Sequence, residues 1–317
     1  MGLNMYIDNP WRDVYDSPES CDPFNYWLPS APLYLDVEPT NFCNMKCNFC
    51  TGQQQGKRSR GYMTYQLFCK IANQAKDMGV QGIRFLRWGE PLLSPDIFRM
   101  ISYANSRGLL THVTTNGKLL TVENATKLID SGLDSIIISF QGVDAEGYRE
   151  MRNDKAETIV TNLMNFKNMR DKSNARNPHI CVSTTTTNET TAEIRQFEES
   201  MSMYCDSVSV GATWFRRLEN KELVKDALPR AKKLPHHFKC IEVMTKLSID
   251  WDGSVSPCCL DYDQQMKIGD LNTESLIKIW KSDKLKHIQG LLSQSQQDLF
   301  VLCSTCELNY NFRGMHE

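Results

Sequence analysis

The hydrophobic and polar positions of the chain alternate between two periods, and this alternation predicts a β/α fold. Short apolar runs bounded by Gly, Pro or polar residues predict strands, whereas apolar residues three and four positions apart predict amphipathic helices. The predicted strands are residues 33–39, 82–91 with a turn, 109–117, 134–142, 179–187 and 207–214. The predicted helices are residues 63–79, 95–108, 121–132, about 158–173 and 191–205.

This repetition predicts a parallel sheet with helices outside it, closed or partly closed into a barrel of six β/α units. We assign residues 33–215 to this partial barrel. Residues 1–32 are rich in Pro, Asp and aromatic side chains without a clear period, and we interpret them as an N-terminal arm. Functional groups in such folds lie at the carboxyl ends of the strands.

The pattern changes after residue 215. Residues 216–239 are charged and contain Pro229 and Pro235, which is typical of a linker. Residues 240–317 then form a second, smaller module. Within it, apolar alternation on both sides of Asp252-Gly253 predicts a β-hairpin, and residues 273–292 predict one helix.

Charge and composition exclude several kinds of partner. The net charge of -2 gives no basic field for nucleic acid. No apolar stretch is long enough to span a bilayer, and the first residues lack the apolar core of a signal peptide. We therefore expect a cytoplasmic protein that binds neither nucleic acid nor membrane.

The chain has 12 cysteines, and their spacing indicates metal binding. Without a secretory signal a disulfide framework is not expected, whereas cysteines at short spacing in such chains often bind metal. Four isolated cysteines are expected to be ordinary core or surface thiols. These are Cys21, Cys69, Cys181 and Cys205.

Three cysteines, Cys43, Cys47 and Cys50, follow the first predicted strand with the spacing C-x3-C-x2-C. Three thiolates cannot close a tetrahedral zinc site by themselves, but they leave one iron of a four-iron cube without a protein ligand. With the aromatic Phe49 before the last cysteine, the motif resembles the signature of the radical S-adenosylmethionine (SAM) superfamily. The resemblance implies a [4Fe–4S] cluster whose open iron binds SAM.

Further motifs extend this resemblance along the barrel. The segment WGEP resembles the family's GGEP motif, which receives the SAM amino group, with Trp88 in place of the first glycine. Arg152 resembles the arginine that holds the SAM carboxylate, and Ser139 resembles a ribose contact. Taken singly, these residues could also belong to surface ion pairs or turns. The resemblance assigns to SAM binding Phe49, Trp88, Gly89, Glu90, Pro91, Asn116, Ser139, Arg152, Ser183 and Thr185.

Four further cysteines lie in the C-terminal module: Cys240, Cys258, Cys303 and Cys306. Four thiolates can complete either a zinc site or a second iron–sulfur cube. From spacing alone a zinc ribbon is an alternative. The order C…G-x4-C…C-x2-C after a SAM-radical barrel resembles the SPASM/Twitch accessory region, and it most resembles the Twitch region of 2-deoxy-scyllo-inosamine dehydrogenase. This resemblance implies one auxiliary [4Fe–4S] cluster.

The resemblance implies reductive cleavage of SAM to a 5′-deoxyadenosyl radical that abstracts hydrogen from an unactivated C–H bond. A flavodoxin or ferredoxin would supply the electron. With an auxiliary cluster as acceptor, we expect oxidation of a hydroxyl-bearing carbon in a small sugar-like or aminocyclitol substrate. Candidates for proton transfer are Arg216, Arg217 and Asp261, each of which could also be a solvated surface residue.

Three alternatives remain open at this point. An epimerase would return a hydrogen atom from a thiol, for which Cys259 is the candidate. A peptide-modifying enzyme is less favoured, because only about 30 residues precede the first strand, too few for the winged leader-binding domain that many such enzymes carry. The third alternative is a non-catalytic iron–sulfur or zinc protein.

Overall fold

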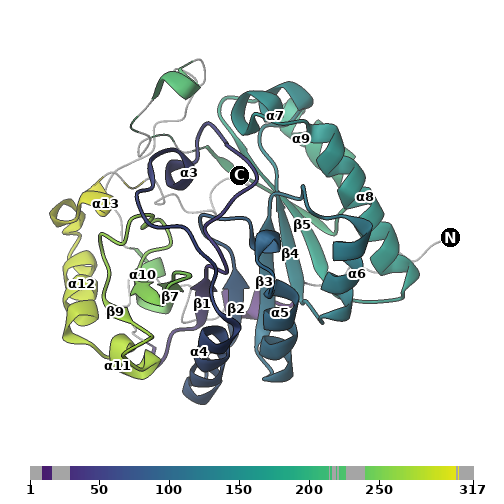
Figure 1. Cartoon of the computed structure of the whole chain (residues 1–317). Coiled ribbons are helices and arrows are strands. Elements are labelled where there is room, and N and C mark those ends of the chain that lie inside the picture. Colours follow the sequence, from purple (N-terminus) through teal and green to yellow (C-terminus); the bar gives the residue numbers. More distant parts are fainter. Residues whose placement is uncertain are drawn as a thin grey trace.

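The computed structural model describes residues 9–15, 29–213, 215, 219, 221–225, 240–304 and 306 (Figure 1). Within these residues one nine-stranded sheet has the order β6-β5-β4-β3-β2-β1-β7-β8-β9. Strands β1 to β6 pair in parallel and in sequence order, which confirms the predicted partial barrel. Their bounds are β1 Tyr34–Val37, β2 Gly82–Phe85, β3 Leu110–Thr115, β4 Ser135–Ser139, β5 His179–Thr186 and β6 Ser207–Ala212.

Helices cover the outer face of this sheet (Figure 1). Because side chains alternate along a strand, Leu35 and Val37 pack outward into the core that includes Phe68 and Ile71 of helix α4. No described helix has the length and apolarity that a membrane span requires. The helices of this part are α3 Thr51–Gln55, α4 Tyr65–Met78, η1 Pro91–Leu93, α5 Ile97–Ser106, α6 Val122–Asp130, α7 Ala145–Arg152, α8 Ala156–Lys172, α9 Thr191–Met201 and η2 Lys221–Val224.

Local signals set the ends of these helices, as α4 illustrates. The Thr64 hydroxyl accepts a hydrogen bond from the Leu67 N–H and caps the first turn, which otherwise leaves its N–H groups unpaired. Gly79 ends the helix with φ of 82°, a conformation that favours glycine. The predicted helix over residues 63–79 therefore forms with its boundaries close to the expected ones.

The C-terminal module shares the sheet of the barrel. Strand β7, Lys246–Ile249, pairs in parallel with β1, so that Tyr34 lies opposite Lys246. The predicted hairpin is confirmed: β7 pairs antiparallel with β8, Ser254–Ser256, and Gly253 in the turn has φ of 88°. Strand β9, Gly269–Asp270, completes the edge. The pairing of β7 with β1 was not predicted.

The prediction of one helix over residues 273–292 is wrong, because two helices form there. The Ser282 hydroxyl accepts from the Leu285 N–H at 3.2 Å and starts a second helix, since serine side chains compete with the continuing backbone pattern. The helices of the module are α10 Glu242–Thr245, α11 Leu276–Trp280, α12 Asp283–Ser293, η4 Gln297–Leu299 and α13 Val301–Ser304.

The described part of the N-terminal arm closes one end of the barrel. Helix α1, Arg12–Tyr15, follows Trp11, which is fully buried and donates its indole N–H to the Thr111 carbonyl at 3.2 Å. A Cβ atom at Gly82, the first residue of β2, would lie 2.5 Å from the Trp11 ring. The arm therefore seals the amino ends of the strands, opposite the expected site. Cys21 and most of residues 216–239 lie outside the described residues.

Candidate active site

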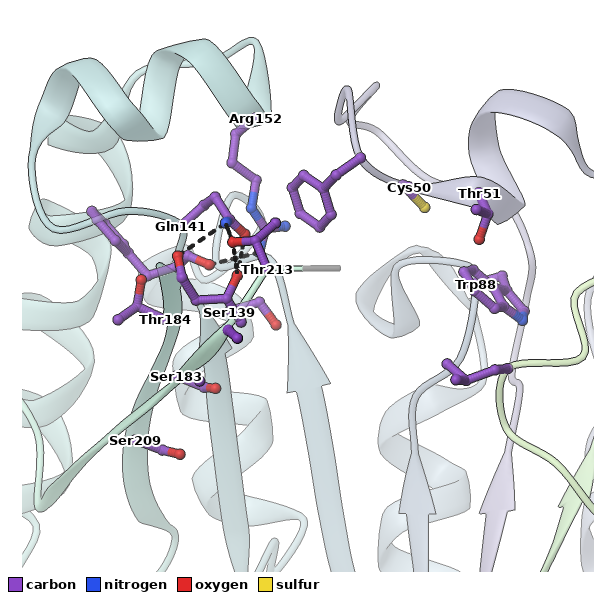
Figure 2. A pocket seen from close by; sticks show the side chains of 16 residues that line it. Cys50, Thr51, Trp88, Ser139, Gln141, Arg152, Ser183, Thr184, Ser209 and Thr213 are labelled. Atoms are coloured by element: carbon purple, nitrogen blue, oxygen red, sulfur yellow. Dashed lines mark hydrogen bonds between the residues drawn. The ribbon is translucent and has the colours of Figure 1, made fainter. Parts of the chain in front are cut away.

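A cavity of about 400 Å³ lies between the carboxyl ends of β4 to β6 and the cysteine loop (Figure 2). Figure 2 shows Cys50, Thr51 and Trp88 on one side and the residues of β4 to β6 on the other. Seven residues that the sequence assigned to SAM or to its cluster line the cavity. They are Phe49, Cys50, Trp88, Ser139, Arg152, Ser183 and Thr185.

Hydrogen bonds hold the cysteine loop at its base and at its tip. At its base, the Thr40 hydroxyl donates to the Gly61 carbonyl at 2.7 Å, and the Asn41 side-chain oxygen accepts from the Gly61 N–H at 3.0 Å. At its tip, the Asn48 N–H donates to the Met151 carbonyl of α7 at 2.8 Å. These bonds hold the loop over the barrel mouth.

The three thiols of the loop are suited to bind an iron–sulfur core, whose iron ions carry the positive charge that thiolates compensate. Burial, with smaller contributions from Glu90 and Cys47, raises the pKa of Cys43, and burial raises the pKa of Cys50 to about 12. Such thiols stay protonated unless a metal compensates the thiolate charge. The Arg152 guanidinium approaches the Cys47 sulfur at 3.7 Å, and the Asn116 amide approaches the Cys43 sulfur at 3.9 Å. Both are donors suited to a bound cluster's sulfur ligands.

Glu90 is buried, and its carboxylate is used within the protein. It accepts from the Thr115 hydroxyl at 2.7 Å, the Asn116 N–H at 2.8 Å and the Leu92 N–H at 3.1 Å. Burial raises its pKa in spite of these bonds. The carboxylate therefore joins the loop after β2 to the loop after β3, and Glu90 is not among the residues that line the cavity.

The other residues of the WGEP segment have distinct positions. A Cβ at Gly89 would lie 2.0 Å from the Thr40 carbonyl oxygen, so this close approach requires glycine. Pro91 begins the short helix η1. Gly89, Pro91 and Asn116 do not line the cavity, although Asn116 contacts the cysteine loop through Asn44 at 2.7 Å.

Trp88 connects the cysteine loop to the C-terminal module. A Cβ at Gly52 of α3 would lie 2.4 Å from the indole ring, so the helix packs directly on it. The ring also meets Tyr262 edge to face, with centroids 5.7 Å apart. The buried indole N–H of Trp88 has no partner in the structure.

Arg152 ends helix α7 and reaches into the cavity (Figure 2). One N–H donates to the Phe140 carbonyl at 3.0 Å, and the guanidinium lies 5.3 Å from the centre of the Phe49 ring. Its Nε is buried and has no hydrogen-bond partner in the described part of the chain. Because an unpaired buried donor is costly, this atom fits a carboxylate supplied by a ligand.

Hydroxyl groups form the opposite wall. Ser139, Ser183 and Ser209 lie side by side across β4, β5 and β6 in the strand register. Above them, the Gln141 amide donates to the Thr213 hydroxyl at 2.7 Å (Figure 2). The sequence reasoning missed Gln141, Ser209 and Thr213, although period-two alternation along β6 places Ser209 on the inner face.

The cysteines of the C-terminal module lie close to one another. Burial raises the pKa of Cys240 well above its usual value, and the nearby thiols of Cys258 and Cys306 add to this effect. The Cys306 N–H donates to the Cys303 carbonyl at 3.1 Å. Among the described residues no three Cys, His, Asp or Glu side chains converge on one ion-sized position. The thiolates of a four-iron cube stand farther apart than the ligands of a single ion.

The structure does not bring the candidate catalytic residues to the cavity. Cys259 does not line it: its thiol approaches Glu242 at 3.9 Å, and burial raises its pKa to about 11. The buried Asp261 carboxylate accepts backbone N–H groups of residues 265 and 266 at 2.8 and 2.9 Å. Arg216 and Arg217 lie outside the described residues. In contrast, Leu260 lines the cavity.

Comparison with protein families identifies two regions. The model of the radical SAM superfamily matches residues 37–201, over half of the 317 residues. The model of an iron–sulfur cluster-binding domain named SPASM matches residues 240–307. The second match contains all four cysteines of the C-terminal module.

Curated relatives match the chain over different lengths. PqqA peptide cyclase of Bradyrhizobium diazoefficiens is 32% identical over 132 residues, which cover 40% of this chain and 34% of that protein. The chain spans about a third of the length of the relatives that it matches above 30% identity. A tungsten-containing aldehyde ferredoxin oxidoreductase cofactor-modifying protein of Pyrococcus furiosus is 24% identical, with 87% of each chain covered.

Solved structures show the same fold. BtrN in complex with AdoMet and 2-DOIA has a TM-score of 0.58 and 18% identity, covering 86% of this chain and 92% of that chain. SuiB of Streptococcus suis bound to the precursor peptide SuiA has a TM-score of 0.66 and 18% identity, covering 90% and 73%. The matched domains imply a SAM-binding [4Fe–4S] cluster and auxiliary iron–sulfur binding. The chain therefore belongs to the radical SAM superfamily and carries a SPASM-type accessory region.

Proposed function

We propose that the protein uses SAM to oxidise a hydroxyl-bearing carbon of a small, neutral, sugar-like substrate. The observation that carries this proposal is that Cys50 and Leu260 line the same cavity. Cys50 belongs to the three-cysteine loop, and Leu260 lies two residues after Cys258 of the second cysteine set. A substrate in this cavity is therefore flanked by both proposed clusters.

The chain's residues divide the cavity into a SAM side and a substrate side. In the proposal Cys43, Cys47 and Cys50 hold the SAM-binding cluster, and Arg152 binds the SAM carboxylate through its unpartnered Nε. The Trp88 ring forms an apolar wall that excludes water. The hydroxyl wall of β4 to β6 is left to orient the ribose and the substrate. Four cysteines of the C-terminal module hold one auxiliary cluster: Cys240, Cys258, Cys303 and Cys306.

When bound, these cofactors supply a 5′-deoxyadenosyl radical and, at the auxiliary cluster, an acceptor for one electron. The substrate carbon loses a hydrogen atom, then one electron and the hydroxyl proton, so that a C–O double bond forms. Among the described cavity-lining residues there is no carboxylate, imidazole or lysine. The proton therefore passes to water in this proposal, and a flavodoxin or ferredoxin supplies the electron that starts the reaction.

The position of Cys259 favours oxidation over epimerisation. A hydrogen-returning thiol must reach the substrate radical, but Cys259 faces Glu242 and does not line the cavity. Its neighbour Leu260 lines the cavity instead. In the proposal the auxiliary cluster is the electron acceptor, and the described lining residues include no thiol donor apart from the proposed cluster ligand Cys50.

The lining also favours a neutral substrate. Cluster cysteine aside, Arg152 is the only charged residue among the described lining residues. A protonated aminocyclitol would find no counter-charge there, whereas a sugar-like molecule can hydrogen bond with the serine and threonine hydroxyls.

A peptide is the second candidate substrate. SuiB, whose structure is bound to its precursor peptide, shares this fold with a TM-score of 0.66, and PqqA peptide cyclase is 32% identical to part of the chain. In this alternative the same hydroxyl wall would hydrogen bond with backbone amides, and the oxidation would occur on a side chain.

Product analysis in deuterated water tests the proposal. Anaerobically reconstituted protein is incubated with SAM, dithionite and panels of neutral sugars, aminocyclitols and short peptides. A sugar product that is two electrons more oxidised and free of carbon-bound deuterium supports the proposal. Deuterium on carbon without net oxidation indicates epimerisation. Turnover of peptides alone indicates the second candidate substrate. Either result contradicts the proposal.

A further inference from the structure

Arg87 occupies a position between the two cysteine sets that neither motif explains. It follows strand β2 and immediately precedes the WGEP segment. Its φ of 102° lies in a region that non-glycine residues rarely adopt because it is strained. Such a conformation persists only where surrounding contacts hold it, and the Arg87 side chain makes contacts of this kind.

The Arg87 side chain is fully buried and ties the barrel to the C-terminal module. Its Nη2 donates to the Asp261 carbonyl at 2.8 Å and lies 2.9 Å from an Asp250 oxygen. The Asp261 N–H in turn lies 3.2 Å from the Cys258 carbonyl oxygen. The guanidinium thus braces the short segment that carries a proposed auxiliary-cluster ligand.

Two donors of this guanidinium remain unused. Both Nε and Nη1 of Arg87 are buried and have no hydrogen-bond partner among the residues that the structure describes. Asp250, the counterion of Arg87, is shared with Arg58 at 3.2 Å, and Arg58 also makes a two-pronged pair with Glu38. The hydrogen bonds from Arg87 to the Asp261 carbonyl and from the Asp261 N–H to the Cys258 carbonyl connect the guanidinium to the segment that carries Cys258. Unpaired buried donors beside the segment that carries Cys258 fit the sulfur atoms of a cluster as hydrogen-bond acceptors.

We propose that Arg87 is a positioning residue for electron transfer, whose buried guanidinium makes the auxiliary cluster easier to reduce. The physical reason is charge. A four-iron cube with four thiolates is anionic, and an added electron makes it more so. A fixed cation with free N–H groups in a low-dielectric surrounding stabilises the reduced state more than the oxidised state. This inference rests on the auxiliary cluster of the proposed function and explains how that cluster could accept the substrate's electron.

The same contacts predict effects of opposite sign for two neighbours. Arg87→Met removes the cation and lowers the reduction potential of the auxiliary cluster. Asp250→Asn removes the counterion, leaves the guanidinium less compensated, and raises the potential. A residue that merely supports folding would not produce shifts of opposite sign when either partner of one ion pair is changed.

The experiment is a redox titration of the full chain, followed by electron paramagnetic resonance. All variants are made in a background in which Cys43, Cys47 and Cys50 are alanine, so that the auxiliary cluster is observed alone. Arg170→Met is the matched control, because Arg170 is equally buried and ion-paired, with Asp206 and Asp171 on the outer side of the barrel. Loss of a buried arginine as such is thereby controlled.

At a fixed solution potential, we expect Arg87→Met to lower the ratio of reduced to oxidised auxiliary cluster at least tenfold. A tenfold change corresponds to about 59 mV for a one-electron couple. Asp250→Asn should shift the potential upward, and Arg170→Met should leave it unchanged. If Arg87→Met does not accumulate as folded protein, Arg87→Lys must give a smaller shift in the same direction. Three results would overturn the inference and leave the proposed function standing. They are a shift below tenfold for Arg87→Met, an equal shift for Arg170→Met, and, where that variant is needed, no shift for Arg87→Lys. Absence of any cluster in the background protein overturns both.

Discussion

The two halves of the barrel interior differ in chemistry. Beside β1, β2 and β7 the interior is filled with matched charges: Asp36 pairs with Arg84 and with Lys246, each at 2.7 Å. Beside β4, β5 and β6 the described residues that line the cavity are uncharged apart from Arg152, and they include several serine and threonine hydroxyls. Figure 1 shows that the charged half is the side on which the C-terminal module packs.

We therefore expect the charged half to contribute to stability and the hydroxyl half to bind ligands. In the charged half Asp36 is paired with Arg84 and Lys246. Although burial alone would raise the pKa of Asp36, these two cations hold it well below its usual range. Such a region joins the barrel to the C-terminal module through buried ion pairs. In the hydroxyl half, Arg152 retains an unpartnered buried donor and the space is open. Substitutions in the first half should therefore change stability, and substitutions in the second should change binding.

The largest expected effect lies at the cysteine loop, where the two halves meet. Cys50→Ala should reduce the iron content by about half, from about eight to about four atoms per chain, because one of two cubes loses a ligand. Cys69→Ala on the outer helix α4 should retain the full iron content. Chemical iron analysis of anaerobically reconstituted protein makes the comparison, and equal iron loss in both variants would contradict it.

The charged half predicts a large loss of stability. Lys246 is fully buried and pairs with both Asp36 and Glu242, so Lys246→Met leaves one negative charge of this cluster uncompensated, although Arg84 still pairs with Asp36. The substitution should lower the free energy of unfolding by about 3 kcal/mol. Urea unfolding of the metal-free protein measures the change. Lys127→Met, which removes an exposed pair on α6, should leave the transition midpoint unchanged. Similar midpoints for the wild type and Lys246→Met would show that the charged half does not contribute cohesion.

In the hydroxyl half, Arg152 should govern affinity for SAM. A hydrogen bond to a charged group contributes about 1.5–3 kcal/mol, so Arg152→Met should weaken SAM binding by roughly 10- to 150-fold. Arg149 on the same helix has an exposed side chain, and Arg149→Met is the matched control. Calorimetric titration without reductant measures both. Unchanged affinity in Arg152→Met would remove Arg152 from the SAM site.

The smallest expected effect is on the hydroxyl wall. Ser209→Ala removes one neutral hydrogen bond of about 0.5–1.5 kcal/mol and should raise the KM for the organic substrate by roughly 2- to 10-fold. Formation of 5′-deoxyadenosine without that substrate should not change. Ser202→Ala, on the outer surface after α9, is the control. An altered SAM affinity with an unaltered substrate KM would reassign Ser209 to the SAM side.

Much of the barrel could be predicted because its signals are local. The period of apolar residues places β2 and α4, and Asp252-Gly253 places the hairpin. The pairing of Tyr34 with Lys246 is not encoded locally, because the two strands are separated by the whole barrel and parallel pairing leaves no turn signal. The break at Ser282 was missed because periodicity continues across it.

The site shows the same division. The spacing of Cys43, Cys47 and Cys50 could be read from the sequence, because a metal cluster requires those residue types near one another. Arg87 was passed over because its role depends on a buried contact with Asp261, far along the chain. Nearness to a cluster ligand suggests Cys259 and the dehydrogenase resemblance suggests Asp261, but neither lines the cavity, whereas Leu260 between them does.

The most direct test of the central claim is whether the open half supports SAM cleavage by this chain. Anaerobically reconstituted protein is incubated with SAM and dithionite, and 5′-deoxyadenosine is quantified against the Cys43→Ala variant. The account predicts multiple turnovers by the wild type and none by the variant. A wild type that binds its iron fully yet releases no 5′-deoxyadenosine, or a variant that releases as much, would contradict it.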